Sequence, residues 1–201
     1  MINDIEEENF KSPISQLMDE LGDNHKDVLL LIREMAEQIG FYRRLLERYE
    51  LDVLTGLPGN NKFREIISNI ESHVRSAGII FFDVNGLKLC NDTGGHHAGD
   101  MLLQKAAESI MYITGGNVQA FRTGGDEFVA LVTDCAESDI DEIIVKWSKK
   151  LNEMNNMDDG VHCSIAFGTA FGEGEYKISD LLELADARMY NEKRKMKSTG
   201  K

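Results

Sequence analysis

The residues with the clearest chemical potential in this chain are three carboxylates that lie far apart in the sequence. Asp83 ends the apolar run AGIIFFD, and Asp126 and Glu127 follow two glycines. Clustered carboxylates repel one another unless a cation lies between them. Hard divalent ions such as Mg²⁺ prefer oxygen ligands, and two of them about 3.5–4 Å apart suit in-line displacement at phosphorus. Asp126 and Glu127 alone would indicate only a solvated acidic turn, so the prediction depends on Asp83 lying nearby.

Other polar residues are suited to holding a nucleotide. Residues 85–88 leave a strand pattern and turn, so their backbone N–H groups could form an anion site. Asn91 and Asp100 offer an amide and a carboxylate, which can bind the carbonyl and N–H groups of a guanine edge. Lys193 and Lys197 stand four apart and share a helix face that could reach a triphosphate. A basic helix end is also favourable for the helix dipole alone.

The composition limits the classes of function. With 35 acidic and 22 basic residues the net charge is −13, which argues against general binding of nucleic acid. An acidic protein that handles an anionic substrate needs a metal ion or a local basic cluster, and the last nine residues, KRKMKSTGK, hold five bases. The three cysteines, Cys90, Cys135 and Cys163, form no C-x-x-C pair, so buried thiols are expected rather than disulfides or a zinc site.

The elements that must position these residues begin with a helical segment over residues 1–50. Ser12-Pro13 predicts a helix start and Gly22 its end, and a longer helix is expected over residues 24–50. A heptad seam runs along the longer helix through Val28, Ile32, Met35, Ile39, Tyr42, Leu46, Tyr49 and Val53. The seam predicts either a coiled-coil dimer or one amphipathic helix lying on its own domain. The chain has no apolar run long enough for a membrane span and no signal-like N-terminus, so a cytoplasmic location is expected.

Residues 51–201 are expected to form one α+β domain. Helices are predicted over 60–73, 97–113, 139–155 and 178–196, with a loop between residue 84 and the second of these helices. Strands are predicted over 77–83, 117–123, 126–132 and 161–171, and Gly124-Gly125 is expected to form a primed hairpin turn with positive φ at both glycines. The order β-α-β-β-α-β predicts a ferredoxin-like (palm-like) fold. In such a sheet the first and third strands are neighbours, which would bring Asp83 beside Asp126 and Glu127.

Four motifs in order along residues 50–198 resemble the GGDEF family. Gly124 to Phe128 is the signature GGDEF, preceded by the usual Arg122. Residues 52–58, DVLTGLP, are similar to the entry motif D-x-L-T-G-L-P of the family. Residues 83–100, DVNGLKLCNDTGGHHAGD, are similar to its D-x-[DN]-x-[FL]-K-x-x-N-D-x-x-G-H-x-x-G-D block, and residues 185–193 to its closing A-D-x-x-M-Y-x-x-K.

The resemblance implies a diguanylate cyclase, which joins two GTP molecules into cyclic di-GMP and releases two pyrophosphates as a homodimer of GGDEF domains. It implies two Mg²⁺ or Mn²⁺ ions per active site, held by Asp83, the Val84 carbonyl, Asp126 and Glu127. The three acidic residues among these would be the catalytic residues.

The substrate-binding residues follow from the same resemblance. Asn91 and Asp100 would bind guanine, and Asp100 is the residue found at this position in GTP-selective members. The residues that would lie along the phosphates and the signature turn are Asn85, Gly86, Leu87, Lys88, Lys193, Lys197, Gly124 and Gly125. Asn85 replaces the commoner Asp and Gly94 a usual aromatic residue, which affects the expected rate more than the expected activity.

Two other functions fit parts of this pattern. A catalytically silent GGDEF domain would bind GTP or cyclic di-GMP as a signalling module, but such domains usually lose part of the signature, which is intact here. A general nucleotidyl cyclase or polymerase-like domain could share the palm-like fold, and Asn91, Asp100 and the signature argue against it.

Overall fold

The structure is a computed structural model that describes residues 26–70, 74–157 and 160–198 of the 201-residue chain. The chain divides into two compact units, residues 1–49 and residues 50–201, and each is described by itself. The helix predicted over residues 12–22 lies outside the described residues. Within the described ranges, no helix has the length and apolar character that crossing a bilayer requires.

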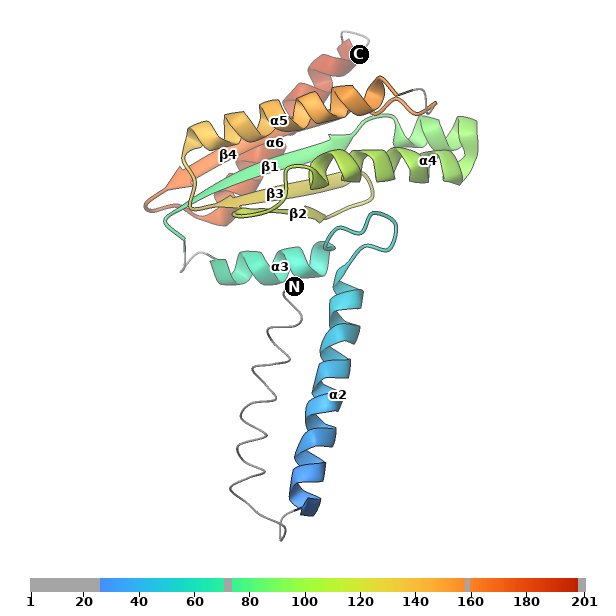
Figure 1. The fold of residues 1–201 in the computed structure, drawn as a ribbon. Coiled ribbons are helices and arrows are strands. Elements are labelled where there is room, and N and C mark those ends of the chain that lie inside the picture. Colours follow the sequence, from blue (N-terminus) through green and yellow to red (C-terminus); the bar gives the residue numbers. More distant parts are fainter. Residues whose placement is uncertain (1–25, 71–73, 158–159, 199–201) are drawn as a thin grey trace. The chain divides into compact units, whose positions relative to one another are not determined.

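The first unit contains α2 (Lys26–Glu50), drawn in blue in Figure 1. Five side chains of the predicted seam are exposed, by 37–61%: Val28, Ile32, Met35, Ile39 and Tyr42. Val53, the last predicted seam residue, is not part of the helix, because α2 ends at Glu50 and the chain turns. The Val53 side chain is 99% exposed in that turn. The described part of the seam is therefore an exposed apolar stripe confined to α2.

The second unit follows the predicted order of elements. Its helices and strands are α3 (Asn60–Ile70), β1 (Ser76–Val84), α4 (Leu87–Met111), β2 (Val118–Arg122), β3 (Glu127–Thr133), α5 (Glu137–Asn155), β4 (Ile165–Glu173) and α6 (Ile178–Ser198). The four strands form one antiparallel sheet in the order β2-β3-β1-β4. The first and third strands lie in the centre, as in a ferredoxin-like unit, so the predicted fold is confirmed.

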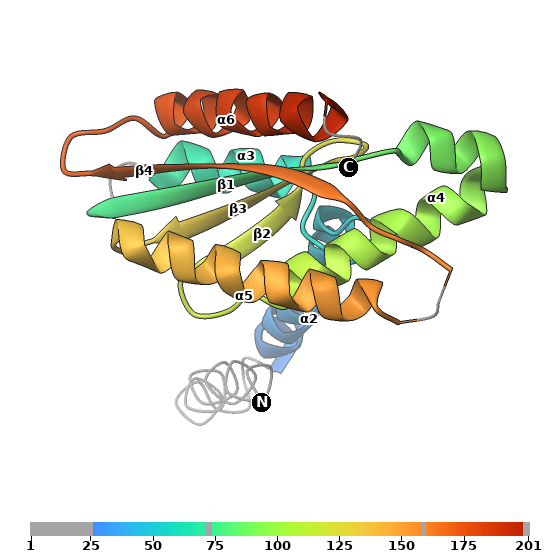
Figure 2. The same ribbon diagram turned by 90° about the horizontal axis from the view of Figure 1, so that it is seen from above.

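Helices cover both faces of the sheet: α4 and α5 lie on one face, and α3 and α6 on the other (Figure 2). Successive residues of a strand point to opposite faces. Phe82 of β1 packs with α4 and α5, whereas Ile79 packs with α3 and α6. By the same alternation Asp83 points to the α6 face. Glu127 points there too, since Val129 of the same strand packs in the cluster of α3 and α6.

The segment after β1 differs from the predicted loop. Helix α4 begins at Leu87 and contains one break, at Gly95 (φ 76°, ψ 173°). Asn, Asp and Gly in this segment are poor helix formers, which is why the sequence pattern predicts a loop. Leu87 and Cys90 pack against the hydrophobic core, and the first turn closes through a hydrogen bond from the Cys90 N–H to the Gly86 carbonyl (2.9 Å). Core packing here overrides the local propensity.

The last strand is also displaced from its prediction. Residues 161–164 lie outside β4, because β1 ends at Val84, which pairs with Ile165. The backbone of this segment bonds to a side chain instead. Asn155 donates to the Cys163 carbonyl (2.7 Å) and accepts from the Cys163 N–H (2.9 Å). These bonds hold the segment that leads into β4 beside the end of α5.

Candidate active site

The predicted carboxylates lie at the sheet edge where β1 ends and β3 begins. Asp83 is directly opposite Glu127 in the antiparallel register. The Val84 N–H donates to the Asp126 carbonyl (2.9 Å), which fixes the start of β3 against the end of β1. Opposite residues of antiparallel strands have Cβ atoms roughly 4.5–5.5 Å apart. The topology thus brings Asp83 and Glu127 together on the face that α6 covers.

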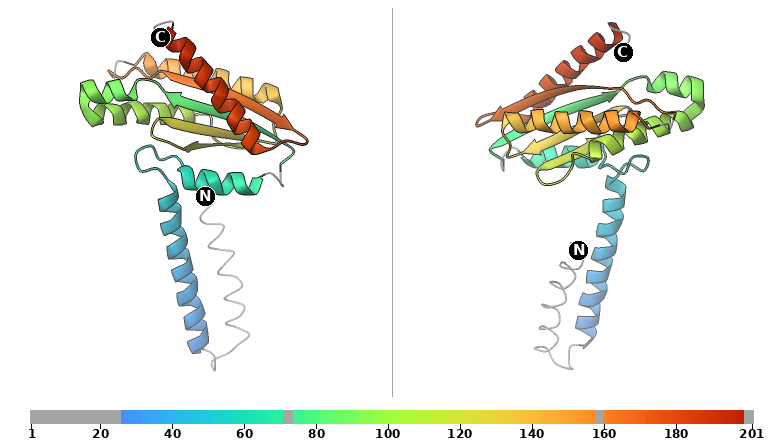
Figure 3. Two further views of the ribbon diagram at one scale, coloured as in Figure 1. Left: turned by 180° about the vertical axis from the view of Figure 1, so that it is seen from behind. Right: turned by 45° about the horizontal axis from the view of Figure 1, so that its top comes forward.

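A lysine from α6 binds the first of these carboxylates. Lys193 Nζ donates to Asp83 Oδ1 at 2.5 Å, although the two residues are 110 positions apart. The Asp83 side chain is 8% exposed and the Lys193 side chain 22% exposed, so the pair is partly shielded from water. Figure 3 (left) shows α6, in red, lying across the sheet. Lys193 was predicted to lie at the phosphates, whereas here it contacts a predicted metal ligand.

Two carboxylates at this edge, those of Asp83 and Glu127, have raised pKa values. Burial raises the pKa of Asp83, and the Asp126 charge adds to this, while Lys193 and Lys197 act in the opposite direction. Burial also raises the pKa of Glu127, followed by repulsion from neighbouring carboxylates. One of these neighbours is Asp186 of α6, to which the sequence analysis assigned no role. Groups of this kind, partly buried and mutually repelling, gain from a cation.

The turn between β2 and β3 carries Gly124 and Gly125, but not in the predicted form. The connection is longer than two residues, because β2 ends at Arg122 and β3 starts at Glu127. Neither glycine is among the described residues with positive φ, so the primed-turn prediction was wrong. A Cβ on Gly124 would lie 2.6 Å from Glu127 Oε2, so the Glu127 carboxylate would have to move. The glycine leaves room for the Glu127 side chain in its present position.

The predicted phosphate-binding segment forms the entry to α4. Gly86 has φ 78°, a left-handed conformation that favours glycine, and Leu87 and Lys88 begin the helix. The first N–H groups of a helix have no acceptor within it and can bind an anion. Asn85 has different partners: its backbone N–H donates to the Ser164 carbonyl (2.8 Å), and its Nδ2 to Ser164 Oγ (3.3 Å). Asn85 therefore ties this entry to the segment before β4.

The candidate guanine-binding residues lie on the two halves of α4, on either side of the break at Gly95. A Cβ on Gly99 would lie 2.0 Å from Asn91 Oδ1, so the Asn91 amide packs directly against Gly99, the neighbour of Asp100. Asn91 is half-buried and Asp100 exposed. The sequence analysis missed Gly99, whose signal was a glycine inside a helical pattern. The fold therefore places the Asn91 amide beside the residue that precedes Asp100.

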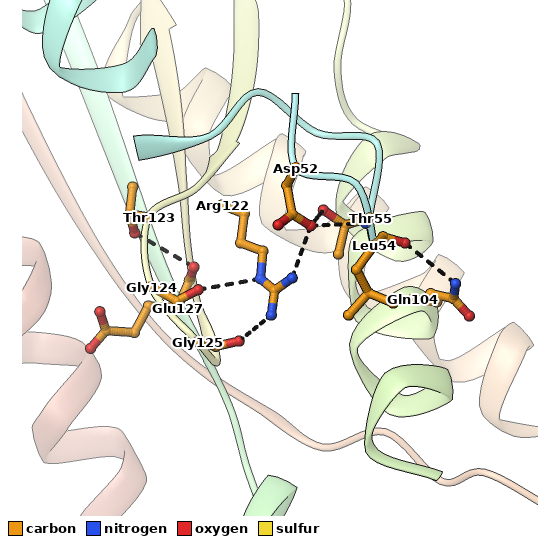
Figure 4. A network of polar contacts seen from close by, with 9 residues as sticks. All are labelled: Asp52, Leu54, Thr55, Gln104, Arg122, Thr123, Gly124, Gly125 and Glu127. Carbon is orange, nitrogen blue, oxygen red and sulfur yellow. Dashed lines mark hydrogen bonds and ion pairs between the residues drawn. The ribbon is translucent and has the colours of Figure 1, made fainter. Parts of the chain in front are cut away.

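Arg122 connects the signature turn to the entry motif (Figure 4). Its guanidinium donates to Asp52 Oδ1 (2.8 Å) and to the Gly124 and Gly125 carbonyls (3.2 and 2.7 Å). Thr55 donates to the same Asp52 oxygen through its hydroxyl (2.6 Å) and its backbone N–H (2.9 Å). The sequence placed Arg122 and Asp52 in separate motifs and did not predict their contact. This network fixes the back of the turn on which Asp126 lies.

The donor set fits a hard divalent ion in chemistry, though the side chains do not form a closed cage. Within residues 26–70, 74–157 and 160–198, no three His, Cys, Asp or Glu side chains converge closely enough to make a preformed metal site. Asp83, Asp126, Glu127 and the Val84 carbonyl nevertheless offer only oxygen donors, which suits Mg²⁺ or Mn²⁺. Lys197 is exposed near the end of α6.

Comparison with known proteins agrees with this geometry. Residues 49–199 match the family described as diguanylate cyclase, GGDEF domain. The cyclic di-GMP phosphodiesterase PdeB of Shewanella oneidensis is 30% identical over 163 residues, which cover 79% of this chain and 19% of PdeB. The diguanylate cyclase DosC of Escherichia coli is 28% identical over 179 residues, 84% of this chain and 37% of DosC. The chain therefore spans well under half the length of these relatives.

A solved structure shows the same fold. The coiled coil and GGDEF domain of DgcB from Caulobacter crescentus, in complex with c-di-GMP, superposes with a TM-score of 0.68 at 20% identity, over 84% of this chain and 95% of that one. The family match covers residues 49–199. It is consistent with the order of the sheet and with the GGDEF turn opposite the end of β1. This chain belongs to the GGDEF family of diguanylate cyclase domains.

Proposed function

We propose that this chain is a cytoplasmic diguanylate cyclase, which joins two GTP molecules into cyclic di-GMP and releases two pyrophosphates. The observation that carries the proposal is the intact signature turn, residues 124–128, whose Glu127 lies opposite Asp83 at the sheet edge. The 28% identity to DosC, a diguanylate cyclase, supports it.

The carboxylate edge would hold two Mg²⁺ or Mn²⁺ ions. Asp83, Asp126, Glu127 and the Val84 carbonyl are the proposed ligands. Bound there, the ions would activate the attacking 3′-hydroxyl and stabilise the departing pyrophosphate. Burial, followed by the Asp126 charge, raises the pKa of Asp83, and this unfavourable setting for a bare carboxylate supports a cation at this edge. The protein contributes fixed oxygen donors on two hydrogen-bonded strands.

Other residues would place the nucleotide. The N–H groups at the start of α4, beginning at Leu87, are directed at an anion by helix geometry. Lys193 and Lys197 would add positive charge at the phosphates. Asn91 and Asp100 would bind the guanine edge, and their unpaired polar groups would reject adenine by about 1–3 kcal/mol each. Gly124 and Gly125 would let the backbone of the turn approach the substrate.

The reaction requires two domains, each with one GTP, and we propose a homodimer. The exposed apolar stripe of α2, with residues such as Ile39 and Tyr42, is the candidate surface that pairs two copies in parallel. The DgcB structure, which contains a coiled coil and a GGDEF domain, supports the proposal.

The direct test is incubation of the purified chain with GTP and Mg²⁺, followed by identification of products by mass spectrometry. We expect cyclic di-GMP and pyrophosphate from GTP, and little product from ATP. Asp83→Asn and Asp126→Ala should each abolish synthesis and leave the circular dichroism spectrum unchanged. Asp141→Ala, an exposed site on α5, is the control and should retain full activity. Substantial turnover by both Asp83→Asn and Asp126→Ala would refute the metal assignment.

The second candidate function is that of a GGDEF domain that binds GTP but does not synthesise cyclic di-GMP. The 30% identity to PdeB, named as a phosphodiesterase, favours it, because a domain of this family is then part of a protein with the opposite named activity. The same experiment separates the two: GTP binding measured by calorimetry, without any cyclic di-GMP formed, would establish the binding module.

A further inference from the structure

The position of Lys193 follows from the way α6 packs on the sheet. Gly168 of β4 provides the space, because a Cβ there would lie 2.2 Å from the Met189 backbone nitrogen. Next to this contact, the Arg188 guanidinium donates to the Thr169 carbonyl (2.8 Å). The backbone of α6 is thus fixed on β4, one turn before Lys193. The packing of the α6 backbone on β4 therefore determines the position of Lys193 at the sheet edge.

The Lys193 ammonium group lies in the field of several carboxylates. Its Nζ donates to Asp83 Oδ1 at 2.5 Å. Burial and the neighbouring carboxylates raise the pKa of Glu127, and the Lys193 charge acts to lower it. A positive charge in contact with Asp83 repels any second cation that approaches the same oxygen. The lysine and a divalent ion therefore compete for Asp83.

We propose that Lys193 is an internal counter-ion, which neutralises Asp83 in the nucleotide-free protein and transfers to the substrate phosphates when GTP binds. This inference rests on the proposed function, because it takes Asp83 as a metal ligand. Phosphates attract both the ammonium group and the metal, whereas at Asp83 the charge of Lys193 opposes the approach of the metal. Nucleotide and metal then bind cooperatively, and each raises the affinity for the other by the same factor.

The first measurement is the affinity of the full nucleotide-free chain for Mn²⁺ alone, by electron paramagnetic resonance of the free ion. Lys193→Met should bind Mn²⁺ roughly tenfold more tightly than the unaltered chain, since one nearby like charge is removed. Lys195→Met is the matched control, because Lys195 lies on the same helix with a 75% exposed side chain near Glu192. This control changes the net charge equally and should alter the affinity less than about twofold. Lys193→Arg keeps the charge and should resemble the unaltered chain.

The second measurement is the coupling between nucleotide and metal. A GTP analogue with a methylene group between the α- and β-phosphates binds without reacting. Saturating analogue should increase the Mn²⁺ affinity of the unaltered chain more than that of Lys193→Met, because the variant has no ammonium group to transfer. In the double variant Asp83→Asn with Lys193→Met, the gain in nucleotide-free Mn²⁺ affinity should disappear.

Several results would overturn the inference. Unchanged or weaker Mn²⁺ binding by Lys193→Met would do so, as would an equal gain in Lys195→Met or a gain that survives in the double variant. If circular dichroism shows that Lys193→Met does not fold, Lys193→Gln removes the same charge and tests the same effect on Mn²⁺ affinity. Failure of the proposed function is distinguishable, because the unaltered chain would then make no cyclic di-GMP. Failure of this inference alone leaves synthesis intact and the Mn²⁺ affinities equal.

Discussion

At the residue scale, two aspartates of the second unit have pKa values shifted in opposite directions. Burial would raise the pKa of Asp52, but hydrogen bonds from Thr55 and Arg122 hold it below its ordinary value. Asp83, also shielded from water, keeps a raised pKa because burial and Asp126 outweigh its lysine partner. The charge of Asp52 therefore stabilises the fold, whereas that of Asp83 costs stability. A residue kept at such a cost is expected where function requires it.

Replacement of Asp52 by Asn should destabilise the second unit at neutral pH. The substitution weakens charge-assisted bonds to a guanidinium that is 13% exposed, and we expect a loss of about 1–3 kcal/mol. A loss of 1 kcal/mol lowers Tm by roughly 2–4 °C in a domain of this size. Thermal denaturation followed by circular dichroism measures the change, with Asp141→Asn on exposed α5 as the control.

The same variant has a defined pH dependence. A carboxyl whose pKa is lower in the folded chain than in the unfolded one stabilises the fold above the unfolded pKa. This contribution is lost as the pH falls from the ordinary value of 3.8 through the lowered folded pKa. The Tm difference between Asp52→Asn and the unaltered chain should be full at pH 7 and should shrink below pH 3.8. A difference that does not change with pH would contradict the role of the Asp52 charge.

Substitution of Gly99 by Ala should weaken GTP binding without unfolding α4. Alanine is the better helix former, but its Cβ would meet the Asn91 amide oxygen at 2.0 Å and displace it. We expect the Kd for GTP to rise roughly tenfold, which corresponds to about one lost hydrogen bond. Calorimetry with the unreactive GTP analogue measures the affinity, and the Tm reports the fold. Unchanged affinity would show that Asn91 does not bind the base.

At the scale of the elements, the contact between α6 and β4 determines where Lys193 lies. Gly168→Ala would insert a Cβ 2.2 Å from the backbone of α6, which must then move away from the sheet. Overpacking of this kind costs about 1–3 kcal/mol, and cyclic di-GMP synthesis should fall with the Tm. Thr169→Ala changes the opposite face of β4 and is the control. If Gly168→Ala keeps both its Tm and its activity, α6 is not held as described.

The elements also show why the site was only partly predictable. The order of helices and strands predicted the neighbourhood of Asp83 and Glu127, because a ferredoxin-like sheet places the end of its first strand beside the start of its third. The helical start of α4 was missed because packing of Leu87 outweighed the poor propensity of its neighbours. The contact of Lys193 with Asp83 spans 110 residues, and no spacing rule connects a terminal helix to a particular strand end.

At the scale of the whole molecule, the proposed synthesis would require two GGDEF units to meet. Deletion of residues 1–48 removes the exposed seam of α2 and leaves the second unit, residues 50–201, complete. Activity at nanomolar protein should fall, because two untethered domains meet only at their bulk concentration. Activity per domain should recover as the concentration is raised into the micromolar range. If the truncated chain matches the full chain at nanomolar concentration, α2 does not bring the domains together.

The first residues of the second unit are bonded to other residues of the same unit. Leu51 pairs with Pro58, the Gly59 N–H donates to the Glu50 carbonyl (2.6 Å), and Asp52 is bonded to Arg122. For a protein engineer, residue 49 is therefore a natural fusion junction, since the residues that directly follow it, Glu50, Leu51 and Asp52, are bonded within the unit. Each residue added to a helix at this junction turns whatever precedes it by about 100°. A series of fusions that differ by single residues would sample the orientations of an input domain at regular angular steps.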